Sequence, residues 1–426
     1  MTSDPRHHQH VNLHTPPEHS GLGAIQVGTA VYRRVNLAFF LAGFVTFVSL
    51  YAVQPLLPEF SKSFGVSPAL GSLPLSLTTG TLAVAMLFVG TLSETWGRKR
   101  VMSGALILTS GLTLLIGFND SFAGLLGLRF LQGLLLAGLP AVAMAYLSEE
   151  MSPSAIASAM GLYISGNAVG GMAGRLLTAI LADVWCWQAA FFILGGACLL
   201  TSLFFAASLP PSHLPPRPFA AAYLFTSLGR HLRDPLLRRL YLISFLAMGA
   251  FVTLYNYLTF RLLEAPYLLS QSQASLIFLV YLLGSLSASI MGHFVNRFGR
   301  APLIRFGLAA MVVGALLTLA AALPWIVLGV GIFTVGFFGV HSVASSGVGR
   351  RAPVAKAQAS ALYLFFYYLG SSISGTVGGF FWSWREWPGV TGLIVTLLLA
   401  GLIFSARLAR PWPPASTAEP PEPQAG

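Results

Sequence analysis

Residues 72–100 read SLPLSLTTGTLAVAMLFVGTLSETWGRKR and contain both features on which the fold depends. The first part, residues 72–92, is apolar and carries no charged side chain. A helix rises about 1.5 Å per residue, so roughly 20 apolar residues cross a hydrocarbon core about 30 Å thick. The second part becomes polar, with an acid at Glu94 and three consecutive basic residues from Arg98. The stretch therefore indicates a membrane-spanning helix that ends in a charged loop.

Apolar stretches of similar length recur along the whole chain. They give twelve predicted spans, at 35–57, 72–92, 101–118, 122–146, 156–181, 187–208, 240–260, 272–292, 302–322, 325–347, 357–381 and 389–408. Each span must be a closed helix, because hydrocarbon offers no water to satisfy backbone polar groups. The composition agrees: 55% hydrophobic and 9% charged residues leave too little polar surface for a soluble globule of 426 residues. The sequence predicts an all-α membrane protein.

Basic residues concentrate on one side of the predicted membrane. If the amino terminus is cytoplasmic, most of the 24 Lys and Arg fall in cytoplasmic segments, whereas the opposite loops hold Lys62, Arg261 and Arg385. This positive-inside asymmetry predicts that both termini are cytoplasmic. It also accounts for the net charge of +11, so we expect no nucleic-acid partner.

The chain divides into two similar halves. Residues 90–98 follow the second span and resemble residues 292–300 after the eighth, at an offset of 292 − 90 = 202. Leu162-Tyr163 also aligns with Leu362-Tyr363, at an offset of 200. These matches predict two parallel six-helix bundles related by an axis along the membrane normal. The predicted domains are a disordered cytoplasmic tail at 1–34, a six-helix bundle at 35–209, a central cytoplasmic loop at 210–239, a second six-helix bundle at 240–408 and a cytoplasmic tail at 409–426.

The loop after the second span has the pattern Gly90-x-Leu-Ser-Glu94-x-x-Gly97-Arg98-Lys99-Arg100. We expect Gly90 to allow close helix contact, Glu94 to supply an acceptor and Gly97 to permit a tight turn. The pattern resembles the loop between helices two and three of the major facilitator superfamily, and the resemblance extends from Val35 to about Arg407. It implies a gating charge network that stabilises one state of an alternating transport cycle. The implied gating residues are Gly90, Glu94, Gly97, Arg98 and Lys99, with Gly292, Gly299 and Arg300 as their copies in the second half.

Three other segments resemble a narrower group within that superfamily. Tyr146-Leu-Ser-Glu149-Glu150, residues 160–167 and residues 341–346 are similar to the YnfM type of bacterial inner-membrane transporter, in the drug and sugar efflux branch. This resemblance implies a multi-pass protein of the bacterial cytoplasmic membrane but names no substrate. Residues 166–175 resemble the glycine-rich helix-five motif of antiporters, with Asn167 where proline is usual. The glycines of this segment recur at every fourth position and predict close contact with another helix.

Three Arg or His side chains lie well inside predicted spans, namely Arg129, Arg175 and His341. Arginine at membrane depth costs about 2.5–3.5 kcal/mol on insertion scales, so Arg129 should face protein or water, with snorkelling as the alternative. No Asp or Glu lies well inside a span, so His341 is the candidate for proton coupling. The alternative is a neutral histidine that is hydrogen-bonded to a neighbouring helix.

The polar lining of a substrate cavity is predicted from amphipathic and amide side chains in otherwise apolar helices. The candidates are Tyr163, Asn167, Tyr255, Asn256, Tyr257, Tyr363, Tyr367 and Tyr368. For any one tyrosine, packing is an equally good interpretation. Two intramembrane arginines without a carboxylate favour a neutral or anionic ligand over a strongly cationic one.

The predicted function is a secondary active transporter of a small solute that works by alternating access, with proton-coupled efflux as the first interpretation. A facilitator or an uptake symporter of a neutral or anionic metabolite is the alternative, and a non-transporting membrane sensor is the alternative from another class. An enzyme is not expected, because no converging nucleophile, paired carboxylate or metal-ligand set lies at membrane depth. We expect no cofactor and no metal site, a lipid bilayer as surroundings, protons as the coupling ion and a monomeric protein.

Overall fold

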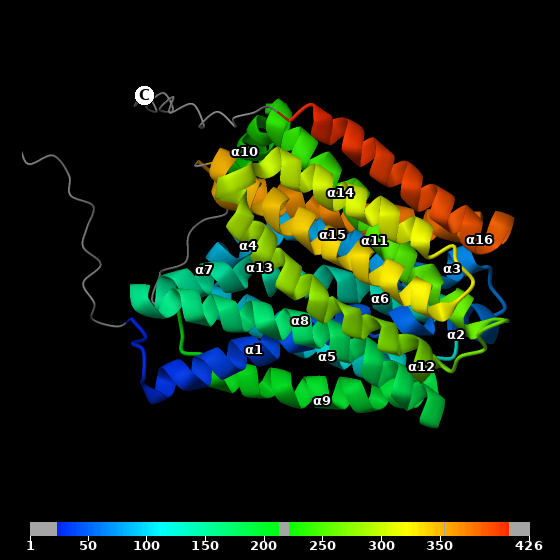
Figure 1. The fold of residues 1–426 in the computed structure, drawn as a ribbon. Helices are drawn as coiled ribbons and strands as arrows, with labels where there is room; N and C mark the ends of the chain where they lie inside the picture. The colour runs from blue at the N-terminus through cyan, green and yellow to red at the C-terminus, as the bar shows by residue number, and fades with distance from the viewer. Residues whose placement is uncertain (1–23, 213–220, 353, 409–426) are drawn as a thin grey trace, which may run out of the picture.

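The computed structural model describes residues 24–212, 221–352 and 354–408, and these are almost entirely helical (Figure 1). The first half contains α1 (Ala30–Tyr51), η1 (Gln54–Leu56), α2 (Leu57–Ser63), α3 (Pro68–Gly71), α4 (Leu73–Trp96), α5 (Arg98–Ile116), α6 (Phe122–Leu136), α7 (Pro140–Glu150), α8 (Pro153–Val184) and α9 (Trp187–Ser208). After these come α10 (Ala221–Arg233), α11 (Pro235–Leu263), α12 (Gln271–Ser275), η2 (Leu276–Val280), α13 (Tyr281–Phe298), α14 (Arg300–Leu317), α15 (Leu323–Arg351) and α16 (Lys356–Ala406).

The predicted spans correspond to these helices. Among the described residues, 10 helical segments are long and apolar enough to cross a membrane. The glycine-rich α8 is not one of them, and α16 counts once although it contains two predicted spans. Arg385 and Glu386 leave the helical conformation inside α16, and Pro388 follows them. The eleventh and twelfth spans therefore meet at a sharp corner.

The same turn occurs at equivalent places in the two halves. Gly97 joins α4 to α5 with φ +88°, and Gly299 joins α13 to α14 with φ +77°. Glycine occupies this region readily because it has no Cβ to clash with the backbone. These turns agree with the predicted duplication and with the proposed use of Gly97.

Close glycine contacts also recur in both halves. Gly166, Gly170 and Gly174 on α8 face the backbone of α1 so closely that an added Cβ would collide with it. On α16, Gly370 faces the carbonyl of Phe245 on α11 in the same way. The predicted glycine stripe is therefore confirmed as a helix contact, and van der Waals packing between close backbones holds each pair together.

The bundle has two ends that differ in how the halves meet. We call the end with α7, α10 and the start of α1 the terminal end, and the end with α2, α3 and α12 the far end (Figure 1). Toward the far end, α4 packs on α16, α3 on α16 and α8 on α12. Near the terminal end, α7 packs on α4, α5 and α8 of its own half, whereas α10 packs on α11 and α16.

One face of helix α4 shows the same difference between the two ends, because it contacts α16 toward the far end and is more exposed toward the terminal end. Gly80 lies against Ser372 of α16. One turn closer to the terminal end, Val84 is 48% exposed; two turns closer, Phe88 is 37% exposed and its ring contacts Phe225 of α10, with centroids 6.3 Å apart. Residues four apart share one helix face. Toward the terminal end α4 therefore separates from α16, and its contact with the second half there is through α10.

Two predicted non-helical segments contain structure. The central loop predicted at 210–239 includes the whole of α10 and the first turn of α11. The tail predicted as disordered at 1–34 is ordered from residue 24 where it is described: Ile25 pairs with Met151 as an isolated β-bridge, and α1 begins at Ala30. Residues 1–23 and 409–426 lie outside the described residues. Backbone pairing with the 150–152 segment accounts for the ordered part, since Ile25 exchanges two hydrogen bonds with it.

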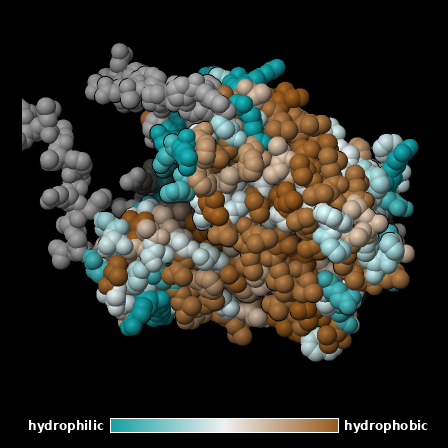
Figure 2. All heavy atoms as spheres, viewed as in Figure 1, coloured by the Kyte–Doolittle hydropathy of each residue, from teal (hydrophilic) through white to brown (hydrophobic). Residues whose placement is uncertain are grey.

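The visible flank of the molecule is broadly apolar between two polar rims (Figure 2). Large exposed side chains on helices include Leu200, Phe306 and Phe380, each more than 60% exposed. A soluble monomer does not expose apolar surface on this scale. The surface is that of a bundle whose helices face lipid.

Candidate functional site

Arg175 occupies the centre of a polar cluster where the two halves meet. It extends from α8 and is 2% exposed. Its Nε donates to Gln54 Oε1 at 2.5 Å, and its Nη1 donates to the Gly171 carbonyl at 2.5 Å. The guanidinium lies 3.8 Å from the ring centroid of Tyr51 on α1. Arg175 is therefore held against its own half by two hydrogen bonds and one cation–π contact.

The other half closes over the same guanidinium. Its Cζ lies 4.8 Å from the ring centroid of Tyr281 and 5.1 Å from that of Phe278. Gln54 continues the link, because its Nε2 donates to Asn256 Oδ1 on α11 at 2.8 Å. Arg175, Gln54 and Asn256 thus form a buried polar chain across the interface. In a low-dielectric interior such bonds are strong if they are made and costly if they are broken.

A second group surrounds His341 on α15. Its Nδ1 lies 3.1 Å from the hydroxyl of Tyr363, and its ring lies 4.8 Å from that of Tyr367. Phe337 stacks on the other side, with centroids 6.1 Å apart. His341 is half-buried. Its neighbours are aromatic side chains of its own half.

Tyrosines connect these two groups. Tyr367 and Tyr368 lie within electrostatic range of Tyr51, and Tyr368 also lies within range of Tyr163. The predicted residues Tyr163, Tyr363, Tyr367 and Tyr368 are therefore brought to one region between the halves. Helices α8 and α16 contribute them, so the region is built from both repeats, whereas Asn256 on α11 belongs to the cluster around Arg175.

Two predicted cavity residues have hydroxyls that are hydrogen-bonded elsewhere, outside this region. Tyr255 is hydrogen-bonded to Thr334 at 2.7 Å, and Tyr257 donates to the Gly375 carbonyl at 2.8 Å. Both side chains are fully buried within the second half. The packing interpretation holds for them, since a hydroxyl already bonded inside its own bundle has no need of a ligand. Asn167 packs against Gly43, at the contact between α8 and α1.

Arg129 is a brace rather than a snorkelling side chain. It is fully buried, and it donates from Nε to the Pro74 carbonyl at 2.9 Å, from Nη1 to the Ser49 carbonyl at 2.9 Å and from Nη2 to the Leu50 carbonyl at 2.8 Å. Nη1 also donates to Gln132. These bonds tie α6 to the end of α1 and the start of α4. Arg129 therefore satisfies backbone groups that hydrocarbon would leave unpaired.

Sequence reasoning missed three residues of the central cluster, namely Tyr51, Gln54 and Tyr281. Gln54 carries an amide inside the predicted span 35–57, so a search for amides in every span would have found it. The two tyrosines also lie in predicted spans, at 35–57 and 272–292, and gave the same signal as the tyrosines that were chosen as candidates. Their position beside Arg175 depends on the packing of α1 against α8 and of one half against the other.

A comparison with protein families identifies the family to which the chain belongs. A model of the Major Facilitator Superfamily matches residues 39–266 and 262–426. The chain belongs to the Major Facilitator Superfamily. The predicted fold and family are confirmed, and the chain is a multi-pass membrane transporter, not an enzyme.

Relatives and a solved structure agree with this assignment. The chain is 49% identical to the MFS-type transporter YybF of Bacillus subtilis (strain 168), over 91% of this chain and 96% of the relative. It is 46% identical to the inner membrane transport protein YnfM of Escherichia coli (strain K12), over 91% and 93%. A crystal structure of a bacterial homolog to the human lysosomal transporter Spinster, inward-facing and unoccupied, matches with a TM-score of 0.69 at 16% identity, over 89% and 95%.

The predicted gating residues Arg98 and Glu94 lie in a charge cluster with a partner that the pattern did not indicate. Arg98 donates to both carboxylate oxygens of Glu149 at the end of α7, each at 2.5 Å. Glu94 lies farther away, at 3.7 Å, and its side chain is 43% exposed. Lys99 donates to the Leu209 carbonyl at 2.5 Å, which fixes the start of the central segment.

The expected contact at Gly90 is absent in this conformation. No described atom outside its own stretch of helix lies within 4 Å of the place where its Cβ would stand, and Gly292 in the second half has one such contact, with Ser342, at 3.9 Å. Both glycines lie near the terminal end, where α4 separates from α16. Arg300, the counterpart of Arg98, follows the Gly299 turn at the start of α14. In the second half Arg351 pairs with Asp234 at 2.9 Å.

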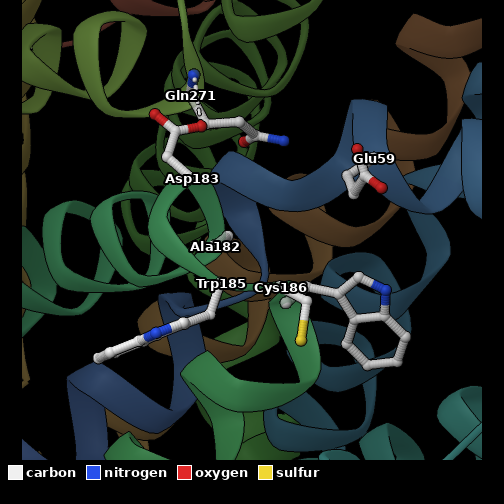
Figure 3. Close-up of a pocket in the computed structure, with 7 residues that line it drawn as sticks. Glu59, Ala182, Asp183, Trp185, Cys186 and Gln271 are labelled. Atoms are coloured by element: carbon white, nitrogen blue, oxygen red, sulfur yellow. Dashed lines mark hydrogen bonds between the residues drawn. The ribbon is translucent and has the colours of Figure 1, made fainter.

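A polar latch lies at the far end. Asp183 accepts hydrogen bonds from the backbone N–H groups of Gln271 at 3.2 Å and Ser272 at 2.7 Å, and from the Ser272 hydroxyl. Burial alone would raise the pKa of Asp183, but these hydrogen bonds lower it below the ordinary value of 3.8. Asp183 and Gln271 also border a cavity of about 280 Å³ with the exposed Cys186 (Figure 3). The latch joins α8 of one half to α12 of the other.

Proposed function

We propose that this transporter exports a small solute by alternating access, in exchange for protons. The observation that supports alternating access is the asymmetry of the interface. Polar and glycine contacts join the halves at the far end, whereas α4 and α16 separate toward the terminal end. A site between two such halves is reached from one side at a time.

The charge pattern supports a cytoplasmic location for the terminal end. Arg98, Lys99, Arg233 and Arg300 all lie at that end, and basic residues favour the cytoplasmic side. With this orientation the described conformation is open inward and closed outward. The bacterial Spinster homolog with the similar fold was crystallised in an inward-facing conformation.

His341 is the proposed proton carrier. The Asp and Glu residues of the described ranges lie at helix ends or in loops, so they do not titrate at the centre of the bundle. His341 lies there, with Tyr363 as a hydrogen-bond partner. A histidine can take up and release a proton, as a proton carrier within a span must. Export is proposed from the resemblance to the YnfM type.

The test is substrate-induced proton movement in everted vesicles, followed with a pH-sensitive dye. We expect wild-type protein to move protons when solute is added and His341→Gln to lose this flux while it still binds solute. His293→Gln is the matched control, because His293 is exposed on α13 away from the cluster. Unchanged proton flux in His341→Gln would reject His341 as carrier. Solute movement without proton flux in wild type would instead indicate a facilitator.

A further inference from the structure

The two buried arginines of the first half differ in how many donors they use. A guanidinium has five N–H donors. Arg129 directs four hydrogen bonds to protein acceptors. Arg175 directs two to Gln54 and the Gly171 carbonyl, and the Tyr51 side chain is a third hydrogen-bond partner, so two of its donors are without a protein acceptor, 5 − 3 = 2. Buried donors are nearly always satisfied, and therefore the shortfall at Arg175 points to a group that the protein itself does not supply.

Arg175 also lacks a counter-charge. None of its acceptors, which are Gln54, the Tyr51 hydroxyl and the Gly171 carbonyl, carries a negative charge. Its other close neighbours are the faces of Tyr51, Tyr281 and Phe278. Aromatic faces offset part of the cost of a buried cation, but each is worth only about 0.5–2 kcal/mol. A buried charge without a partner carries a much larger penalty, which an anionic ligand would relieve.

The polar atoms next to Arg175 without a partner are also donors. The Tyr281 hydroxyl and the Asn256 Nδ2 are buried without a hydrogen-bond partner among the described residues. Tyr281 presents its ring to Arg175, and Asn256 is joined to Arg175 through Gln54. Donors without acceptors therefore come from both halves. A carboxylate accepts on both of its oxygens and donates nothing, so it fits this set.

The surroundings select the rest of the ligand. Phe278 stacks on Tyr255 with centroids 5.4 Å apart, and Tyr281 lies 5.6 Å from Phe251 in a stacked pair. Across the interface, Tyr51 and Phe47 form another ring pair at 5.9 Å. Flat aromatic walls favour a planar π-system over an aliphatic body of the same size.

We propose that Arg175, together with Tyr281 and Asn256, binds the carboxylate of an aromatic organic anion, which is the solute class of this transporter. This inference rests on the proposed function, because it places the solute between the halves. The anion bridges Arg175 of the first half and Tyr281 of the second. Binding therefore adds a contact between the two halves on the side of the far end, where they already touch.

The experiment compares matched ligands on the purified full-length protein. The probes are benzoate and 2-naphthoate, their primary amides benzamide and 2-naphthamide, and cyclohexanecarboxylate as the non-aromatic acid. We expect the aromatic carboxylates to raise the melting temperature progressively as their concentration increases. The amides should bind about tenfold more weakly or worse, because they lack the charge that pairs with Arg175.

Three variants assign the effect to residues. Arg175→Gln removes the charge, and Tyr281→Phe removes one hydroxyl while it keeps the ring. Arg385→Gln, at the corner of α16 beside Trp384, is the control for loss of an arginine elsewhere. We expect carboxylate affinity to fall about tenfold or more in Arg175→Gln and severalfold in Tyr281→Phe, with Arg385→Gln unchanged. If Arg175→Gln does not fold, Tyr281→Phe still tests the site, since its packing is unchanged.

The outcomes separate this inference from the proposed function. Equal binding of acids and amides, or an unchanged carboxylate response in Tyr281→Phe and Arg175→Gln, overturns the anion site. Proton-coupled movement of neutral solutes alone would leave the exporter intact and reject the aromatic anion. Binding of aromatic acids without any transport in vesicles would keep the site and reject the exporter.

Discussion

At the scale of single residues, Arg98 of the predicted gating motif is bonded more closely to Glu149 than to Glu94, the acid within the motif. Glu149 accepts two short hydrogen bonds from Arg98, whereas Glu94 is 3.7 Å away and half-exposed. A hydrogen bond to a charged group is worth about 1.5–3 kcal/mol, and an exposed pair is worth about 1 kcal/mol or less. We therefore expect Glu149→Ala to slow transport about tenfold and Glu94→Ala to slow it less than about threefold.

Initial transport rates in proteoliposomes check this prediction, with reconstituted protein amounts matched between variants. Arg98→Ala should resemble Glu149→Ala, because either change removes the same two bonds. The charge-swapped double variant Arg98→Glu with Glu149→Arg should recover part of the loss. A larger effect of Glu94→Ala than of Glu149→Ala would contradict this prediction and would mean that Glu94 is the more important partner of Arg98 for transport.

The sequence indicated some of these residues and not others for a physical reason. A charge or a glycine inside a span is unfavourable or unusual in its own right, so Arg129, Arg175 and the α8 glycines could be predicted from composition alone. Tyr255 and Tyr368 look alike in sequence, but one hydroxyl is bonded to Thr334 and the other side chain lies near the opposite half. Their difference is tertiary, and no local pattern encodes it.

At the scale of helices, the pairing of α1 with α8 sets a limit on side-chain size. A Cβ at Gly170 would collide with the Phe44 carbonyl, whereas a Cβ at Gly161 on the same helix meets no described atom within 4 Å. We expect Gly170→Ala to destabilise the protein by about 1–3 kcal/mol, the usual cost of overpacking. Gly161→Ala is the matched control and should be neutral or slightly stabilising, because alanine is the better helix former.

Thermal unfolding in a single detergent measures both glycine variants. Gly370→Ala extends the test to the second half, since Gly370 faces the Phe245 carbonyl in the equivalent pair of α16 with α11. A similar loss in Gly170→Ala and Gly370→Ala would agree with the duplicated packing. If Gly170→Ala and Gly161→Ala unfold at the same temperature, α8 does not approach α1 as closely at Gly170 as the structure shows.

Helix predictions succeeded where hydrophobicity decides the outcome and failed where partner surfaces decide it. The spans follow from apolar length, and the turns at Gly97 and Gly299 follow from the repeat. Helix α10 was missed because it lies in a polar stretch after several prolines. Its buried residues Leu224, Leu228 and His231 are covered by the second half, so its stability depends on that docking.

At the scale of the whole molecule, alternating access requires the far end to open while the terminal end closes. The latch between Asp183 and Ser272 joins the halves at the far end, so a disulfide there would hold that end shut. Cys186 is exposed beside the same cavity and would compete for oxidation. The cross-linking variant is therefore Asp183→Cys with Ser272→Cys in a Cys186→Ser background.

A cross-link at the far end should stop transport while solute binding is retained. We expect the oxidised double-cysteine variant to lose nearly all transport and to regain it on reduction, because the outward-open state cannot form while the bond is intact. Solute binding from the terminal side should persist in the oxidised protein, since that side is already open. Each single-cysteine variant, treated with the same oxidant, controls for damage unrelated to the cross-link. Full transport by the oxidised protein would mean that the far end does not open during the cycle, and the solute would then need a route other than one between the two halves.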